Sequence, residues 1–386
     1  MAALTHLGQY WSAPHGEVRL IVCGGVSMSP SGELLGDAWD VSDLDMLPRH
    51  RRRFRDTSGD VDWKLAAWTY SSLPFPAVEL IEALEASGGR IDEWIRDLDV
   101  ERGGLVRLDL ATLDRDPAAD VDHLVAPIIP RRAQAFGVTY LNSALERETE
   151  GRRGDYGFVY RSVKDRAERP ELFLKGTSPE HFVGPRGRMG LRSDLTNSCD
   201  MDGSDVERVT VSSGIEPELA AIVYSTGEIW GYTLANDVSG NRIENETLLY
   251  LYQAKHFTGA LVLGPLVMIS TEQSNPDVEI ATRIFDGDGE TLFERVSSSS
   301  NINAPIRTLI DWAAGHIRLT PGEVFSTGTD VVPDGPVKVL DESMRVEISS
   351  PSIGTLRHYT GFVGRNHPLN LDYSRLEIAA IARDGL

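Results

Sequence analysis

The stretch that decides the fold is "GIEPELAAIVYSTGEIWGYTLANDVSG", residues 214–240. Two apolar runs rich in β-branched and aromatic residues flank the turn sequence STGE, a pattern typical of a β-hairpin. Three acids, Glu216, Glu218 and Asp237, stand at the open end of this hairpin. Because carboxylates are rarely buried without a partner, their place in such an apolar neighbourhood requires a chemical explanation.

The spacing of the acids predicts that they converge. Glu216 and Glu218 are two residues apart, so on a strand both side chains point to the same face. Pro217 cannot donate to a strand ladder, which places this point at a strand start, a sheet edge or a bulge. The returning arm of the hairpin can bring Asp237 beside the glutamates. The alternative is a purely structural role, in which the glutamates line a solvated edge strand and Asp237 caps a turn.

Three carboxylates in one pocket repel each other unless a positive charge lies between them. A set of oxygen ligands without nearby His or Cys favours Mg²⁺, with Mn²⁺ or Ca²⁺ as alternatives, over zinc or iron. Lys255, in "LYLYQAKHFTGA", is one of only five lysines and could add a fixed positive charge beside the metal.

Composition sets the broad class of the protein. The chain has 386 residues, 41% of them hydrophobic and 25% charged, which is typical of a globular protein with room for two domains. A net charge of -20 argues against nucleic acid and anionic membranes as partners. Two cysteines do not make a disulfide framework, and no apolar run approaches the ~20 residues of a membrane span. We therefore expect a cytoplasmic protein.

The pattern along the chain predicts an α+β fold that is mostly β. Residues 1–125 are expected to form a small N-terminal α/β domain, with a strand at "EVRLIVCGG" and a helix at "PAVELIEALEASGG". Residues 126–386 contain many short β-rich runs, from "RVTVSS" to "MRVEISS", separated by turn sequences such as "DGDGE". Two helical segments, "NSALERETEG" and "APIRTLIDWAAGHI", interrupt the second domain.

Several motifs in fixed order carry a resemblance to a known family. "GIEPELA", "GYTLANDVSGNRIENETLLYLYQAKHF", "LGPLV" and "FSTGTDVVP" together resemble the fumarylacetoacetate hydrolase family. Within that family, "NETLLYLYQAK", "PELFLKGTSPEHFVGP" and "GLRSD" look like the branch of 2-keto-3-deoxy sugar-acid dehydratases. The match covers roughly residues 134–360.

The resemblance implies a catalytic domain folded as a mixed β-roll and a Mg²⁺ ion held by Glu216, Glu218 and Asp237. It also places Lys255 in the metal pocket and Thr329 of "STGTD" on the carboxylate of the substrate. Family members of this size form oligomers, so a homodimer or a homotetramer is expected.

Other charged residues in the motif segments are candidates for the site. Lys175 in "LFLKGTSPEHFVGP" and Arg192 in "GLRSD" could bind the anionic substrate, or each could form a structural ion pair. The segment "YLNSALERETEG" resembles the lid of the family. It offers Glu146 and Glu148 but lacks the His that hydrolases of the family use to orient an attacking water, which weakens the case for C–C hydrolysis.

These residues predict a Mg²⁺-dependent dehydratase. It would convert a small 2-keto-3-deoxypentonate derived from xylonate or arabinonate to 2,5-dioxopentanoate in non-phosphorylating pentose degradation. Lys255 could be the base, or could instead bind the substrate carboxylate, and Glu146 or Glu148 could be the acid, or could lie on an exposed helix face. Two alternatives remain: a hydrolase or decarboxylase of acylpyruvate-like or oxaloacetate-like acids, and an inactive family member that acts as a binding protein.

Overall fold

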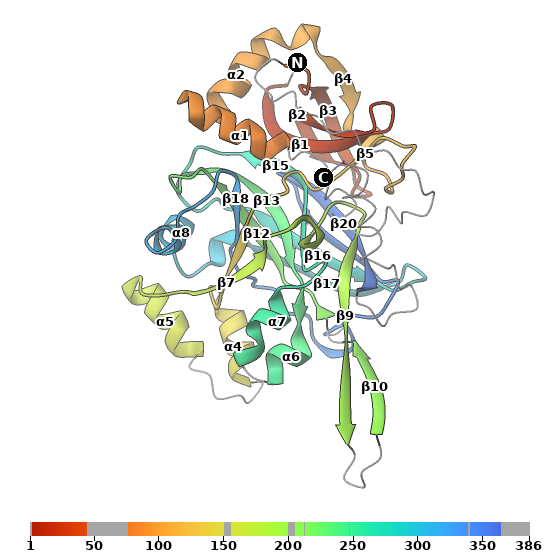
Figure 1. Cartoon of the computed structure of the whole chain (residues 1–386), viewed down its shortest axis with the longest axis vertical. Coiled ribbons are helices and arrows are strands. Elements are labelled where there is room, and N and C mark those ends of the chain that lie inside the picture. Colours follow the sequence, from red (N-terminus) through yellow and green to blue (C-terminus); the bar gives the residue numbers. More distant parts are fainter. Residues whose placement is uncertain are drawn as a thin grey trace, which may run out of the picture.

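The structure, a computed structural model, describes residues 2–44, 76–149, 156–199, 205–211, 213–246, 248–338 and 340–363. Within these ranges the body consists of a twelve-stranded sheet, a six-stranded sheet and a short two-stranded ribbon, with helices around them (Figure 1). The predicted α+β fold, mostly β, is confirmed. None of the described helices is both long enough and apolar enough to cross a bilayer.

The larger sheet runs through the whole body. Its strands lie in the order β4 (Val106–Asp109), β3 (Leu34–Asp40), β2 (Glu17–Met28), β1 (Leu4–Ser12), β15 (Leu261–Ile269), β13 (Ile229–Asp237), β12 (Pro217–Val223), β18 (Glu323–Ser326), β6 (Ala133–Gly137) and β7 (Glu171–Gly176). In addition, β5 (His123–Leu124) pairs with β1, and β8 (Phe182–Val183) pairs with β15.

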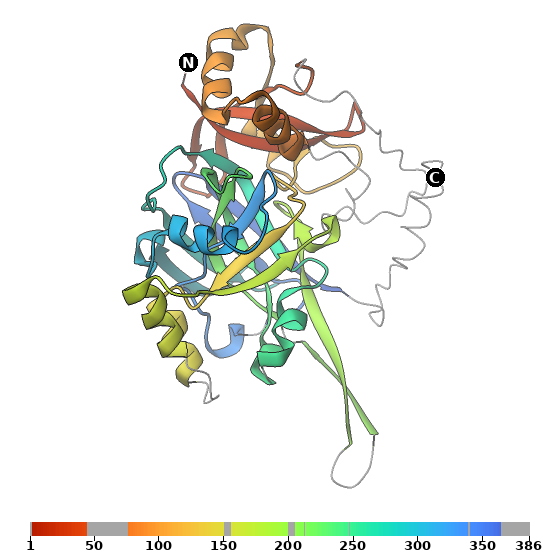
Figure 2. The same ribbon diagram turned by 60° about the vertical axis from the view of Figure 1, so that its left-hand side comes forward.

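The smaller sheet has the order β10 (Asp205–Val211), β9 (Arg188–Cys199), β20 (Gly354–Val363), β19 (Arg345–Ser350), β16 (Glu279–Phe285) and β17 (Thr291–Ser298). The two-stranded ribbon joins β11 (Ser213–Gly214) to β14 (Ser239–Gly240). The outer part of β9 pairs with β10, and the resulting hairpin projects away from the body in both views (Figures 1 and 2).

The helices lie around the sheets, some at the end that holds the N-terminal strands and the others along the rest of the body (Figure 1). Those near the N-terminal strands are α1 (Pro76–Ser87), α2 (Ile91–Glu101) and α3 (Leu110–Leu113). The others are α4 (Leu141–Thr149), α5 (Tyr156–Arg166), α6 (Asn241–Glu246), α7 (Leu251–Lys255) and α8 (Ile306–Ala314). Short 3₁₀ turns lie at Arg102–Gly104, Pro179–His181, Leu248–Tyr250, Ser299–Asn301 and Gly335–Val337.

The hydrophobic pattern explains these elements. The apolar residues of α1 recur at three- and four-residue steps and are buried, as predicted: Val78, Leu80, Ile81 and Leu84. Strands β12 and β13 are buried along their whole length, which is typical of central strands covered on both faces. The hairpin around residues 214–240 therefore lies inside the protein, so its acids are not on a solvated edge.

Strand β1 connects the N-terminal strands to the rest of the sheet. It pairs antiparallel with β15, with His6 opposite Met268 and Leu7 opposite Val267. The sheet is therefore continuous across the boundary that the sequence predicts near residue 125, just after β5. The division into two domains at that point stays a prediction.

A buried charge cluster stabilises the pairing of β6 with β18 beside the central hairpin. The carboxylate of Glu323 is fully buried and accepts hydrogen bonds from Arg132 Nε at 2.7 Å, Arg132 Nη2 at 2.8 Å and Gln134 Nε2 at 2.6 Å. We expect Glu323→Ala to lower the free energy of unfolding by about 3 kcal/mol, because these donors lose their partner. Urea unfolding measures this loss. The exposed pair Arg131–Glu82 is the control, and Glu82→Ala should cost less than about 1 kcal/mol; equal losses would contradict the prediction.

Candidate metal centre

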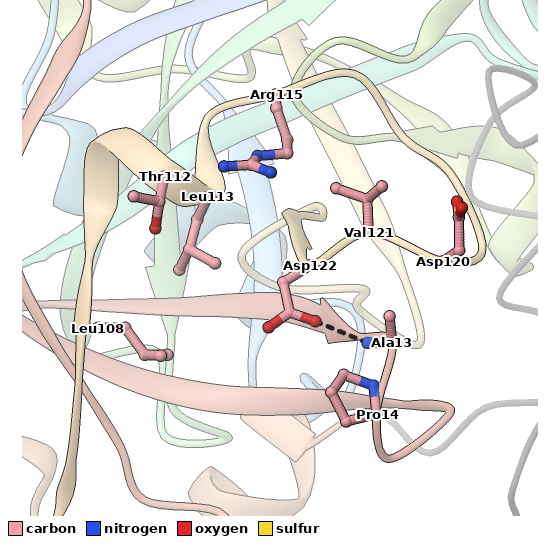
Figure 3. Close-up of a pocket in the computed structure, with 9 residues that line it drawn as sticks. All are labelled: Ala13, Pro14, Leu108, Thr112, Leu113, Arg115, Asp120, Val121 and Asp122. Atoms are coloured by element: carbon pink, nitrogen blue, oxygen red, sulfur yellow. Dashed lines mark hydrogen bonds between the residues drawn. The ribbon is translucent and has the colours of Figure 1, made fainter.

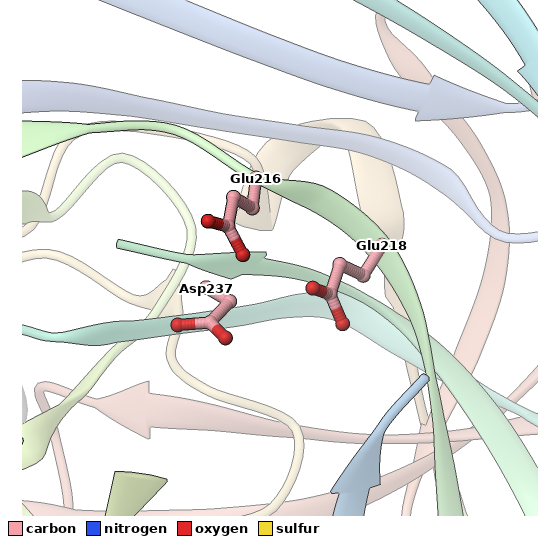
Figure 4. A group of neighbouring side chains, drawn as sticks. All are labelled: Glu216, Glu218 and Asp237. Carbon is pink, nitrogen blue, oxygen red and sulfur yellow. The ribbon is translucent and has the colours of Figure 1, made fainter. Parts of the chain in front are cut away.

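The central hairpin brings the three acids together. Glu216 directly precedes β12, Glu218 lies in β12, and Asp237 ends β13. The register sets Pro217 opposite Asn236, and the backbone N–H of Asp237 donates to Glu216 O at 2.9 Å. One carboxylate oxygen from each acid lies within 4.8 Å of the others, and all three side chains turn toward one space (Figure 4). The geometry is that of a coordination site open to one cation.

The acids are buried deeply enough to need a compensating charge. Glu218 is only 1% exposed and Asp237 is fully buried. Gly328 N–H donates to Glu218 Oε2 at 2.7 Å, but Glu218 Oε1 has no hydrogen-bond partner among the described residues. Burial, and then the charges of Asp237 and Glu216, raise the pKa of Glu218 well above its usual value. A divalent cation would satisfy the orphaned oxygen and neutralise the repulsion, so the residues present fit a metal.

Two lysines lie against the three acids. Lys175, in β7, is fully buried; its Nζ is 2.5 Å from Asp237 Oδ1 and donates to Val238 O at 2.8 Å. Lys255, at the end of α7, donates from Nζ to both carboxylate oxygens of Glu216 at 2.8 Å and to Ser239 Oγ at 2.5 Å. Lys175 therefore pairs with Asp237, while Lys255 pairs with Glu216 and lies 3.7 Å from Asp237 Oδ2.

A Thr-Gly-Thr loop after β18 runs along the backbone of β12. The hydroxyl of Thr327 donates to Leu219 O at 2.7 Å, and the hydroxyl of Thr329 donates to Pro217 O at 2.8 Å. Gly328 between them has a φ of +93°, and a Cβ there would lie 1.9 Å from Thr139 Oγ1, so only glycine fits. The contact of Thr329 with the substrate carboxylate stays a prediction, since in this structure its hydroxyl proton is engaged with the backbone.

The remaining predicted site residues lie around this core. Arg192 donates from Nη1 to Gln253 O at 2.5 Å, and its guanidinium carbon lies 6.0 Å from the ring centre of Phe257, so it contacts α7 and the residues after it. Glu146 and Glu148 lie in α4, and their side chains are outside the described part of the structure. Their roles stay predictions.

Sequence reasoning missed two residues that support Glu216. The side-chain oxygen of Asn236 accepts the backbone N–H of Glu216 at 3.0 Å, and its amide nitrogen lies 2.9 Å from Nε2 of His358. His358 is fully buried in β20. An Asn directly before Asp237 was a weak signal, but nothing local links it to a His 122 residues away in the chain.

Burial of His358 predicts a sensitivity to acid. Burial lowers the pKa of His358 from 6.5 to about 3. Below pH 6.5 the His358 ring binds a proton in the unfolded chain but not in the folded protein. The free energy of unfolding is therefore unaffected by this ring above pH 6.5 and decreases as the pH drops from 6.5 toward 3. Between pH 7 and pH 5, wild type should lose about 2 kcal/mol more than His358→Gln in urea unfolding. Equal losses would show that the ring is protonated in the native state.

A surface hollow of about 600 Å³ lies elsewhere, on the N-terminal strands and the segment that follows α3 (Figure 3). No acid of the central hairpin lines it. Its lining consists of Ala13, Pro14, Leu108, Thr112, Leu113, Arg115, Asp120, Val121 and Asp122. Asp122 there accepts the backbone N–H of Ala13 at 2.8 Å. The candidate site is therefore identified by its converging carboxylates rather than by the size of a cavity.

Comparison with known proteins identifies relatives of this chain. The family model described as fumarylacetoacetate (FAA) hydrolase C-terminal matches residues 215–359, a range that begins just before Glu216. The chain is 34% identical over 234 residues to a probable 2-keto-3-deoxyxylonate dehydratase of Haloferax volcanii, covering 61% of this chain and 73% of the relative. It is 32% identical over 236 residues to the 2-dehydro-3-deoxy-D-arabinonate dehydratase of Saccharolobus solfataricus, covering 60% and 72%.

Solved structures share the fold. A 2-keto-3-deoxy-D-arabinonate dehydratase complexed with magnesium and 2,5-dioxopentanoate aligns over 93% of this chain and 99% of its own, with a TM-score of 0.58 and 22% identity. A fumarylacetoacetate hydrolase from Exiguobacterium antarcticum aligns over 93% and 100%, with a TM-score of 0.53 and 20% identity. The sequence relatives and the family model show that this chain belongs to the fumarylacetoacetate hydrolase family of enzymes.

Proposed function

We propose that this enzyme is a Mg²⁺-dependent dehydratase that converts a 2-keto-3-deoxypentonate to 2,5-dioxopentanoate. The observation that carries the proposal is the convergence of three carboxylates, two of them buried, beside two lysines. Such a site suits a small anionic 2-keto acid, because its carboxylate and keto oxygens complement a cation flanked by ammonium groups. The dehydratase names of the two sequence relatives support the choice among the reactions of the family.

Glu216, Glu218 and Asp237 would hold the cation, and Mg²⁺ is the hard ion that three carboxylates suit best, with Mn²⁺ or Ca²⁺ as alternatives. When bound, it supplies Lewis-acid polarisation of the C2 carbonyl, which acidifies the protons on C3. The two lysines orient the acids. Lys175 fixes Asp237 and Lys255 fixes Glu216, so little rearrangement accompanies the reaction.

Lys255 is the group best placed to move a proton. In its neutral form its Nζ accepts a proton from C3, while Glu146 or Glu148 of α4 donates a proton to the hydroxyl that leaves C4 as water. Transfer of one proton from C5 to C3 then gives an enol, and ketonisation of this enol gives the C5 aldehyde. The net reaction removes one water and needs no other reactant.

The test is a product analysis. The purified protein is incubated with Mg²⁺ and, in turn, 2-keto-3-deoxyxylonate, 2-keto-3-deoxyarabinonate and a set of acylpyruvates, and the products are identified by mass spectrometry. Loss of one water with formation of an aldehyde supports the dehydratase. Cleavage of an acylpyruvate into two acids would identify a hydrolase, and absence of turnover with every compound would contradict both activities.

A further inference from the structure

Asp330 directly follows the Thr-Gly-Thr loop that bonds to β12, the metal-holding strand, and its carboxylate accepts three hydrogen bonds. Asn142 Nδ2, in the first turn of α4, donates to Asp330 Oδ1 at 2.9 Å. Ser297 Oγ and Asn301 Nδ2 donate to Oδ2 at 2.7 and 3.0 Å. We propose that Asp330 is a positioning residue that fixes the start of α4 beside the metal centre, an inference that rests on the proposed function of that centre.

The two residues that precede Asp330 in the chain bond to β12, the strand that carries Glu218. Its neighbour Thr329 donates to Pro217 O, the carbonyl between the two glutamates, and Gly328 N–H donates to the carboxylate of Glu218. A shift of this loop would therefore move a proposed metal ligand. The carboxylate of Asp330 is thus held in a fixed relation to Glu218.

The segment that leads into α4 has a constrained backbone. Val138, three residues before the helix, has a φ of +56°, a conformation that costs about 1–3 kcal/mol for a β-branched residue. The next residue is held from two sides: Asn303 N–H donates to Thr139 O at 2.8 Å, and Thr139 Oγ1 donates to Thr327 O at 2.6 Å. The strained entry fixes where α4 begins, and the bond from Asn142 to Asp330 fixes the direction in which it leaves.

The start of α4 is close enough to the centre for this to matter. Tyr140, directly before the helix, is buried, and its pKa is raised first by burial and then by the charge of Glu218. Helices α4, α6 and α7 lie at the same end of the body in both views (Figures 1 and 2). Because α4 carries Glu146 and Glu148, its direction decides whether an acid can reach the leaving hydroxyl.

An exchange of the two side chains tests the proposal. Asn142→Asp sets a second carboxylate against Asp330, so repulsion should displace α4 and lower kcat about tenfold or more. Asp330→Asn alone should be mild, since the amide of Asn142 can turn to present its oxygen. The double variant Asn142→Asp with Asp330→Asn restores a donor–acceptor pair in the reverse sense and should recover kcat to within about threefold of wild type. Mn²⁺ affinity, measured by calorimetry, should stay within about twofold throughout.

The control is Ser297→Ala, which removes a donor from the same carboxylate without touching α4 and should leave kcat unchanged. Amide hydrogen exchange of residues 141–149 provides a readout that needs no turnover. Exchange should be faster in Asn142→Asp and restored in the double variant. Wild-type kcat or wild-type exchange in Asn142→Asp, failure of the double variant to recover, or a parallel loss of Mn²⁺ binding would overturn the proposal. If wild type dehydrates none of the pentonates, the exchange data still judge Asp330, and only the proposed function fails.

Discussion

Glu218→Gln is expected to lower kcat at least about a thousandfold while the fold stays intact. The amide removes one of three negative charges that would hold the cation, and Lewis-acid stabilisation of the transition state is worth several kcal/mol. A loss of about 4 kcal/mol corresponds to about a thousandfold in rate. Steady-state kinetics with the pentonate substrate measures the effect, and Glu279→Gln, the same substitution at an exposed position of β16, should leave kcat unchanged.

Thermal unfolding of the same variants separates loss of metal from loss of fold. In chelator, Glu218→Gln should be about as stable as wild type, because burial already raises the pKa of Glu218 well above its usual value and the amide resembles the protonated acid. Mg²⁺ at 100 times its Kd should stabilise wild type by about 2.7 kcal/mol and should leave the variant unchanged. Full activity of Glu218→Gln, or equal stabilisation of both proteins by Mg²⁺, would contradict the metal assignment.

Lys255→Met is expected to lower kcat by about 10²–10⁴, the range that general acid–base groups supply. All three carboxylates stay in place in this variant and a neighbouring positive charge is lost, so Mn²⁺ should still bind, and the loss should lie in kcat rather than in metal affinity. Titration of Mn²⁺ by calorimetry together with pentonate kinetics distinguishes these effects. A variant that keeps kcat and raises only KM would show that Lys255 binds the substrate carboxylate instead.

Lys175→Met is the matched comparison for Lys255→Met. Both lysines contact an acid of the centre, Lys175 from β7 and Lys255 from α7. Lys175 is fully buried against Asp237, so its removal leaves that buried carboxylate with only Lys255 Nζ, 3.7 Å away, and should cost up to about 3–5 kcal/mol of stability in chelator. Mg²⁺ should recover much of this loss by taking the place of the ammonium charge. If the kcat of Lys175→Met in Mg²⁺ is as low as that of Lys255→Met, the assignment of Lys255 as the base would be contradicted.

The centre of the fold was predictable because its signals are local. The two-residue spacing of Glu216 and Glu218, the proline between them and the turn after β12 fix the strand start, the shared face and the hairpin within 27 residues. The structure has β12 beginning at Pro217, as the missing N–H requires. The turn then sets Asp237 opposite Glu216. These local signals allowed the three acids to converge, and the family resemblance then favoured the metal site over a solvated edge strand.

The partners of these acids were not predictable from pattern alone. Lys175 and Lys255 reach the site from different elements, β7 and α7, and the pattern marked Lys255 only as one of few lysines, without showing which acid either lysine contacts. The bond from Asn236 to His358 joins residues 122 positions apart, and the pairing of β1 with β15 joins segments more than 250 residues apart. Such contacts depend on how strands are ordered in the sheet, which hydrophobic periodicity does not specify.

The pairing of β1 and β8 along one side of β15 also protects against self-association. Strand β15 has the sequence LVLGPLVMI, an uncharged stretch whose unpaired edge would offer backbone N–H and C=O groups to another chain. Its first residues are covered by β8 and its last residues by β1, while β13 covers the opposite side. Strand β1 of the N-terminal region therefore covers part of the edge of β15. A chain that begins after β1 would expose that edge and would be prone to aggregate during synthesis.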